Sequence, residues 1–279
     1  MKKYALSLAL LVTPFMAFAL DTPVASPSSE VKQRVGLTDF TINYSRPSVK
    51  DREVFGDLVP FNEVWRTGAN ASTKLTFNQD IIFGGTRVEA GKYALYTLPG
   101  EQNWSVILST NTDLWGSSGY SSDQDVARVD VIAKKSHNAM ETLLITFDHL
   151  RNDSAELVLL WDDTRVSVPL QLFTADQVKA NIEEAKATIA NWSGNNFASA
   201  ARAYHEYDLD QELALEWIDK AIATNGKAFW WVHTKAKILV ALDRKEDAIK
   251  AAEQSLQLAT ADSNGAYIKQ NNELLATLR

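Results

Sequence analysis

The chain contains 279 residues, has no cysteine and carries a formal net charge of −7 at pH 7. Without cysteine it can form neither disulfides nor cysteine-ligated zinc sites, so a packed core must hold it together. The acidic balance argues against nucleic acid or anionic lipid as a partner.

The first segment has the pattern of an export signal. Lys2 and Lys3 precede an apolar run over residues 4–18, and Ala17-Phe18-Ala19 is a small-x-small cleavage signal. An uncleaved membrane anchor is the alternative, but the run is shorter than the roughly 20 residues that a spanning helix needs. We therefore predict a signal peptide over residues 1–19, a flexible leader over residues 20–29, and a periplasmic or secreted protein without a membrane span after cleavage.

Residues 30–173 show the period of β-strands. Apolar and polar residues alternate in short segments, and turn signals such as Gly84-Gly85 and Pro99-Gly100 separate them. This pattern indicates an antiparallel sandwich, jelly-roll-like in its arrangement. Asp162–Thr164 is short enough to join two strands as a hairpin. The predicted strands cover residues 31–35, 38–44, 73–77, 80–83, 92–97, 104–108, 127–133, 142–147, 155–161 and 165–172.

From Thr174 onward the period changes to that of α-helices, which predicts an all-α domain over residues 174–279. Capping boxes open the first helix at Thr174 and the fifth at Asp243, and Asp208 or Asp210 caps the third. The predicted helices cover about residues 174–192 and 197–207, a segment ending at 224, residues 228–242, a segment ending near 258, and residues 266–278.

The helical segment contains an internal repeat of 34 residues. Ala214 aligns with Ala248, and Ile222 with Leu256, without a gap between them. Small residues are needed where paired helices pack closely. This period resembles the tetratricopeptide repeat, which implies stacked helix pairs and a protein or peptide partner. A plain helical bundle is the alternative.

Residues 44–70 form an arginine-rich stretch that breaks the strand pattern. Arg46 lies two residues after Tyr44, on the apolar face of a strand, and Arg66 lies two residues after the apolar Val64. Because every second side chain of a strand points to the same face, both arginines are predicted to point inward at one end of the sandwich. A buried guanidinium needs a partner, which predicts either a structural network or a site for a small anionic or sugar-like ligand. The candidate ligand-binding residues of this motif and its expected neighbours are Arg46, Arg52, Arg66, Asn70 and Asp125.

A second irregular stretch covers residues 113–125 and carries Trp115 and Tyr120 among glycines and serines. Aromatic side chains on a flexible loop suit ligand contact. Rings that cover an open end of the sandwich would instead be structural. Trp115 and Tyr120 complete the set of candidate ligand-binding residues.

The sequence contains no recognised catalytic constellation. None of the four histidines pairs with another at a metal-ligand spacing, and no nucleophile elbow or phosphate-binding glycine loop is present. We therefore predict no metal and no cofactor, and we assign no catalytic residue.

Several segments occur in an order that resembles one bacterial exported family, known as domain of unknown function 2911. They are YSRPSVKDREVFGDLVPFNEVWRTGAN over residues 44–70, AGKYALYTLPG over residues 90–100, the spacing of Trp115, Gly116, Tyr120 and Asp125, and LVLLWDDTRVSVPL over residues 157–170. The resemblance covers about residues 26–172. It implies a secreted or periplasmic β-rich domain, in some members followed by helical repeats, and it implies no activity or catalytic residue.

Two classes of function are compatible with these patterns. The first is an exported noncatalytic binding or interaction protein, which the lack of a catalytic signature favours. The alternative is an unrecognised periplasmic hydrolase or transferase that acts on an anionic or carbohydrate-like substrate. In that case Arg46 and Arg66 would stabilise the anion, with Asp125 as the acidic partner.

Overall fold

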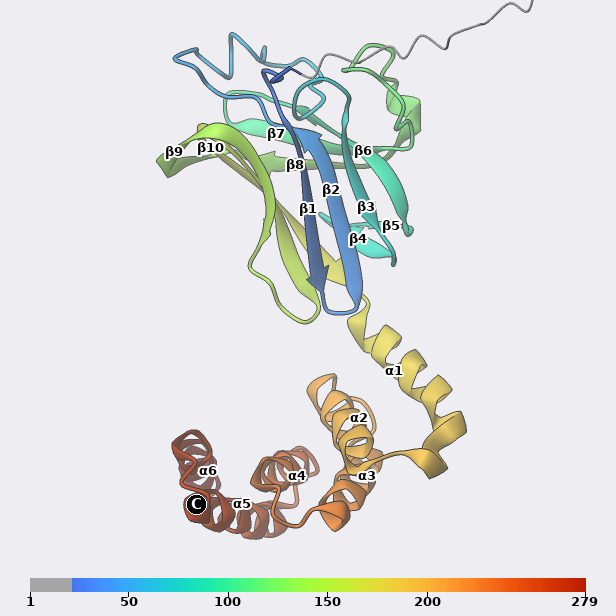
Figure 1. Ribbon diagram of the computed structural model, residues 1–279, viewed down its shortest axis with the longest axis vertical. Helices are drawn as coiled ribbons and strands as arrows, with labels where there is room; N and C mark the ends of the chain where they lie inside the picture. Colours follow the sequence, from blue (N-terminus) through green and yellow to red (C-terminus); the bar gives the residue numbers. More distant parts are fainter. Residues whose placement is uncertain (1–21) are drawn as a thin grey trace, which may run out of the picture.

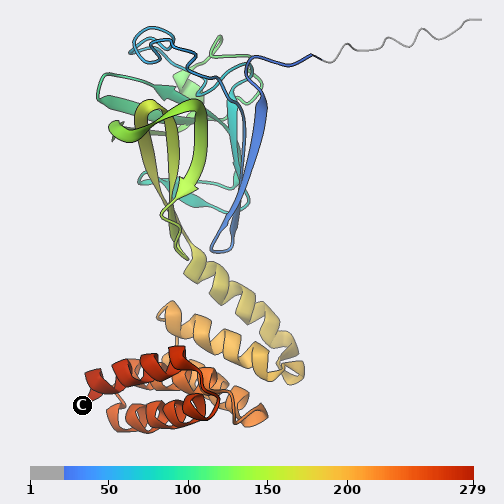
Figure 2. The same cartoon turned by 60° about the vertical axis from the view of Figure 1, so that its left-hand side comes forward.

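A computed structural model describes residues 22–279 of the chain (Figure 1). The predicted signal peptide lies outside these residues. Within them, the strands occupy residues 28–172, here called the β part, and six α-helices occupy residues 174–278, here called the helical part. Helix α1 leaves one end of the β part and leads to the other five helices, as both views show (Figure 2).

The β part contains two antiparallel sheets, as the alternating pattern predicts. One sheet has six strands in the order β1-β2-β3-β6-β7-β8, and the other has four in the order β5-β4-β10-β9. The strands of the described chain are β1 (Ser28–Val35), β2 (Thr38–Ser45), β3 (Thr73–Phe77), β4 (Ile81–Phe83), β5 (Thr86–Val88), β6 (Gly91–Leu98), β7 (Asn103–Ser109), β8 (Asp125–Ile132), β9 (Lys134–Asp148) and β10 (Ser154–Leu172). A short 3₁₀ helix, η1 (Ser122–Gln124), precedes β8.

The two sheets share one apolar core. Ile42 and Leu75 of the six-stranded sheet and Leu157 and Val168 of the four-stranded sheet are fully buried in the same cluster. Along each strand these residues alternate with more exposed ones, because successive side chains point to opposite faces of a sheet.

Strand β10 folds back on itself at its centre. Asp162 has a φ of +50°, and the N–H of Leu172 donates to the carbonyl of Asp153 at 2.7 Å, so the two ends of the segment lie together. The predicted hairpin at Asp162–Thr164 is therefore confirmed. Its tip lies at the end of the β part that is remote from α1 (Figure 1).

The helical part agrees with the predicted order of helices but differs at the first one. Its helices are α1 (Thr174–Ala185), α2 (Gly194–Glu206), α3 (Gln211–Thr224), α4 (Phe229–Ala241), α5 (Lys245–Ala261) and α6 (Gly265–Leu278). The predicted helix to Trp192 stops at Ala185 and continues as a 3₁₀ helix, η2 (Lys186–Asn191), in which Thr188 departs from helical geometry. Within residues 22–279 no helix combines the length and apolarity that membrane crossing requires.

The predicted capping boxes at Thr174 and Asp243 are wrong. Helices α1 and α5 have Phe173 and Arg244 at their N-caps, without a side-chain cap. The Thr174 hydroxyl donates instead to the carbonyl of Asn152 at 2.8 Å and so ties α1 to the β part. Of the two alternatives for α3, Asp210 is the cap, because it accepts from the N–H of Leu213 at 2.9 Å.

Candidate functional site

Arg46 connects the two sheets. Its Nε donates to the carbonyl of Leu143 in β9 at 2.7 Å, and the side chain is half-buried. The next residue, Pro47, accepts from the N–H of Leu143 at 2.9 Å, so the chain after β2 runs beside the other sheet. The partner of this guanidinium is therefore a backbone carbonyl, which makes Arg46 a structural residue.

Arg52 and Asn70 also bind nearby parts of the chain. The exposed Arg52 donates from Nε to the carbonyl of Val49 at 2.9 Å and from Nη2 to the carbonyl of Ser48 at 2.6 Å. Asn70 has a φ of +60°, which asparagine tolerates, and its amide donates to the Ser45 hydroxyl at 3.2 Å. Both side chains close loops, and neither contacts Arg46 or Arg66 by a hydrogen bond within residues 22–279.

Arg66 lies on the outer face of the six-stranded sheet, so the expectation that it points inward is wrong. The backbone of Trp65 pairs with Thr97 of β6, and the Trp65 ring packs into the core. The neighbouring side chain must then point away from the core, as Val64 does in a small cluster on the outer face. Arg46 and Arg66 therefore have separate surroundings.

The loop over residues 110–121 covers this outer face. The Tyr120 ring packs 5.2 Å from Tyr96, and its hydroxyl donates to Asp125 Oδ2 at 2.7 Å. Arg128 Nη2 donates to the Tyr120 hydroxyl at 2.7 Å and to Asp125 Oδ2 at 3.0 Å. Burial, followed by the hydrogen bond to Asp125, raises the pKa of Tyr120 to about 12. These contacts hold the loop on the sheet.

Trp115 is 73% exposed on this loop. The next residue, Gly116, lies beside the Arg66 side chain, because a Cβ added to this glycine would be 3.5 Å from Arg66 Nη1. The buried Nε of Arg66 has no hydrogen-bond partner within residues 22–279. The structure thus brings four of the seven predicted residues under or onto one loop and leaves three elsewhere. The four are Arg66, Trp115, Tyr120 and Asp125; the other three are Arg46, Arg52 and Asn70.

Replacement of the two arginines should have different effects on stability. Arg46→Ala should lower the free energy of unfolding by about 1–3 kcal/mol, because a half-buried carbonyl loses a charged donor. Arg66→Ala should cost less than about 1 kcal/mol, because no hydrogen bond or ion pair of the described chain depends on it. Urea unfolding followed by tryptophan fluorescence measures both. An equal or larger loss for Arg66→Ala would contradict these assignments.

An open cleft of about 220 Å³ lies between the loop after β2, the loop between β6 and β7, and the central bend of β10. Both sheets and the loop after β2 contribute to it. Phe55, Phe61 and Trp104 are its aromatic residues, and Trp104 is almost completely buried. The charged residues of its lining are Glu53, Glu101, Lys134, Lys135, Asp162 and Asp163.

A cluster of aromatic rings lies behind the cleft. Phe55 packs edge-on against Trp104 with ring centroids 4.8 Å apart, and Trp65 stacks on Trp161 at 5.6 Å. Phe55, Trp104 and Trp161 also line an inner cavity of about 10 Å³. Trp161 is 2% exposed, and its indole N–H has no hydrogen-bond partner within residues 22–279. Such an unpaired donor is costly unless water or a ligand group meets it.

Sequence reasoning missed this cleft because each contributing residue has an ordinary local explanation. Asp162-Asp163 fits a turn, and residues 53–61 fit a loop. One signal was present: three of the segments that carry the family resemblance supply residues 53–61, Gly100 and residues 162–164 of the lining. Their meeting at one place could not be read from local patterns.

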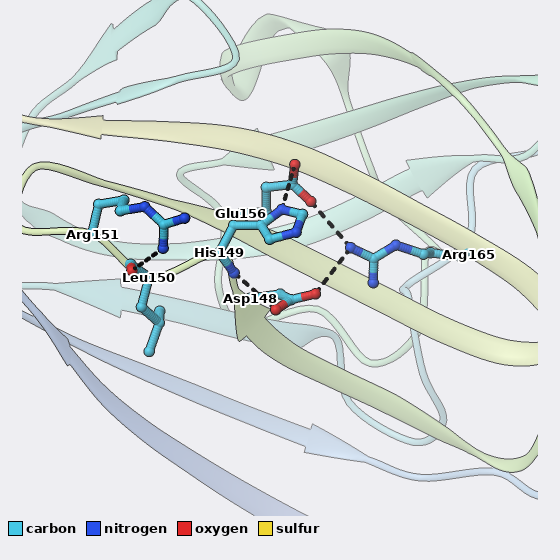
Figure 3. Close-up of polar contacts among 6 residues, drawn as sticks. All are labelled: Asp148, His149, Leu150, Arg151, Glu156 and Arg165. Atoms are coloured by element: carbon cyan, nitrogen blue, oxygen red, sulfur yellow. Dashed lines mark hydrogen bonds and ion pairs between the residues drawn. The ribbon is translucent and has the colours of Figure 1, made fainter.

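A separate group of charged side chains lies on β9, β10 and the loop between them (Figure 3). His149 Nδ1 lies 3.2 Å from Glu156, and Arg165 bridges Glu156 and Asp148 at 3.1 Å and 3.3 Å. His149 and Asp148 have side chains more than half exposed, and the group includes no hydroxyl or thiol. It is a surface ion network, which contributes little to stability. Residues 22–279 contain no group of three or more acidic or histidine side chains placed to hold a metal ion.

These features define a protein with a β part of two antiparallel sheets, a cleft with an aromatic lining, and six helices after it in the described chain. The family model described as protein of unknown function (DUF2911) matches residues 26–170. The chain belongs to this family, as the resemblance predicts. No curated protein and no solved structure matches it.

Proposed function

We propose that the chain is an exported, noncatalytic binding protein whose β part holds a small polar ligand in the cleft. The observation that carries this proposal is the aromatic lining of the cleft, in which half-buried Phe55 and Phe61 lie beside charged side chains. Small-molecule sites are commonly concave, with an apolar lining and a few polar groups that fix orientation. The cleft thereby takes the place of the arginine motif as the candidate ligand site.

A thermal-shift screen of mature protein, residues 20–279, tests this proposal. Periplasmic metabolites, glycans and metal salts serve as probes, because a ligand that binds the native state raises its apparent stability. We expect a hit whose shift is lost in Phe55→Ala and kept in Trp115→Ala, a variant of the other candidate site. A hit that responds only to Trp115→Ala would contradict the assignment to the cleft, and conversion of the hit to product would favour the hydrolase alternative.

We further propose that the β part is a jelly-roll-like sandwich that folds independently of the helical part, with the boundary near Phe173. The single core shared by its two sheets supports this proposal. Limited proteolysis should release a stable fragment that ends near this residue. If residues 20–173 produced alone are unfolded, the two parts form one cooperative unit.

The helical part is proposed to be a tetratricopeptide-like array that binds a protein or peptide. The repeat supports this, since Ala214 and Ala248 occupy equivalent positions in α3 and α5 and are both fully buried. Crosslinking and pull-down from periplasm, with and without residues 174–279, should give different partners. Identical partner lists would contradict the proposal.

Export is proposed from the pattern of residues 1–19 alone. N-terminal sequencing of the exported protein should find Leu20 as the first residue. Retention of Met1 would contradict both the cleavage site and the proposed periplasmic or secreted location.

A further inference from the structure

The lining of the cleft offers hydrogen-bond acceptors and donors together. Four carboxylates and two lysines belong to it, and one pair is already joined, since Lys135 Nζ lies 3.0 Å from Asp163 Oδ2. The charged groups of the lining without an ion-pair partner within residues 22–279 are Glu53, Glu101, Asp162 and Lys134.

The two signs of charge are interspersed. Lys134 and Lys135 pair in the β-ladder with Arg165 and Thr164, which places both lysines beside the turn that carries Asp162-Asp163. An anion in the cleft would therefore meet several carboxylates, and an organic cation would meet two lysines. A ligand group that both donates and accepts hydrogen bonds, as a hydroxyl does, suits this lining better than either ion.

The aromatic base adds a second requirement. Phe55 and Phe61 are half-buried and present ring surface to the cleft, whereas Trp104 beside Phe55 is almost completely buried. The ligand must then combine an apolar face with hydroxyl oxygens. A sugar ring has this combination, because its C–H groups form an apolar patch between its hydroxyl groups.

We propose that the cleft binds a neutral sugar residue, free or at the end of an oligosaccharide. Its C–H face lies on Phe55 and Phe61, and its hydroxyl groups donate to the carboxylates and accept from Lys134. This assignment rests on the proposed function of the cleft as a ligand site and adds the chemical class of the ligand.

The experiment is binding of mature protein to an array of neutral, acidic and amino-substituted glycans, together with choline and citrate as non-sugar ions. Isothermal titration calorimetry then follows each positive compound at about 0.05 M and 0.5 M NaCl, because salt screens charge–charge attraction. We expect saturable binding of a neutral glycan whose affinity changes less than about twofold between the two salt concentrations.

Two variants and a matched control locate the site. Phe55→Ala should weaken binding at least tenfold, whereas Leu58→Ala, an exposed apolar residue of the same loop, should leave it unchanged. Glu101→Gln should weaken binding of a neutral sugar only a few-fold, because the amide oxygen still accepts a hydrogen bond. Circular dichroism confirms that each variant is folded.

The outcomes separate the two proposals. Cleft-dependent binding of choline, citrate or a charged glycan alone, with strong salt dependence, would overturn the sugar assignment and leave the cleft as a ligand site. Binding that is insensitive to Phe55→Ala and Glu101→Gln, or no binding to any compound of the array, would overturn both.

Discussion

Replacing Asn271 by alanine should lower the free energy of unfolding of the helical part by about 2–5 kcal/mol. Asn271 is fully buried in α6, and its Oδ1 lies 2.8 Å from His233 Nδ1 in α4. Its amide donates to the Ser255 hydroxyl of α5 at 2.9 Å and to the carbonyl of Tyr267 at 2.8 Å. Truncation leaves these buried polar groups unpaired, and each such group costs about 1–3 kcal/mol.

The same helix provides a matched control. Asn272 is exposed, so Asn272→Ala should change the free energy of unfolding by no more than about 0.5 kcal/mol. Urea unfolding followed by far-ultraviolet circular dichroism compares the two variants. Similar losses for both would show that helix propensity, and not the buried network, determines the effect.

The network also predicts a dependence on pH. Burial lowers the pKa of His233 below its ordinary value of 6.5. The hydrogen bond that His233 Nδ1 donates to Asn271 Oδ1 opposes this shift only in part, and nearby Lys237 lowers the pKa further. The unfolded chain therefore takes up a proton on this residue before the folded chain does. Stability from neutral His233 should be present above pH 6.5 and decline as the pH falls from there toward the folded-state pKa. Unfolding of His233→Gln, measured over the same range, should lack this decline; an identical pH profile would contradict the assignment.

Trp161→Ala should cost about 3–5 kcal/mol in the β part, since it deletes a buried indole from the core. Trp161 is 2% exposed, stacks on Trp65 at 5.6 Å and packs edge-on against Phe55 at 5.9 Å. Neighbours on both sheets restrain the rings, so the cavity left behind cannot close fully. The variant should also lose any ligand that depends on the aromatic base of the cleft.

Trp115→Ala removes the same side chain from an exposed position and serves as the control. Trp115 is 73% exposed, so its replacement should change stability by less than about 1 kcal/mol. Thermal unfolding of both variants, followed by near-ultraviolet circular dichroism, gives the comparison. A loss for Trp161→Ala as small as that for Trp115→Ala would mean that the aromatic cluster is not packed as described.

Two local features were predictable from short-range chemistry. The hairpin at Asp162–Thr164 needs only a turn between two alternating segments, and Asp210 caps α3 because its side chain reaches an N–H three residues on. The capping box at Thr174 failed although its pattern is correct. The Thr174 hydroxyl has a tertiary partner, the carbonyl of Asn152, and that contact replaces the local one.

In the candidate site, too, predictions from neighbouring residues succeeded and those that depend on distant contacts failed. Parity placed Arg46 on the inner face correctly, because β2 continues regularly up to it. It failed for Arg66, because the irregular chain between residues 46 and 64 carries no period, and the pairing of Trp65 with Thr97 sets which side chain faces the core. Trp115 and Tyr120 could be grouped in advance because one loop carries them, and Asp125 follows that loop at the start of β8.

The sequence alone determined the order of the helices and of every strand except β5, the change of period at Thr174 and membership of the family, since each depends on residues close together along the chain. The tertiary structure decided which arginine faces the core, how Asn271 joins three helices, and that three distant segments meet in one cleft. These features depend on contacts between residues far apart in the chain, and periodicity carries no information about which distant segments meet.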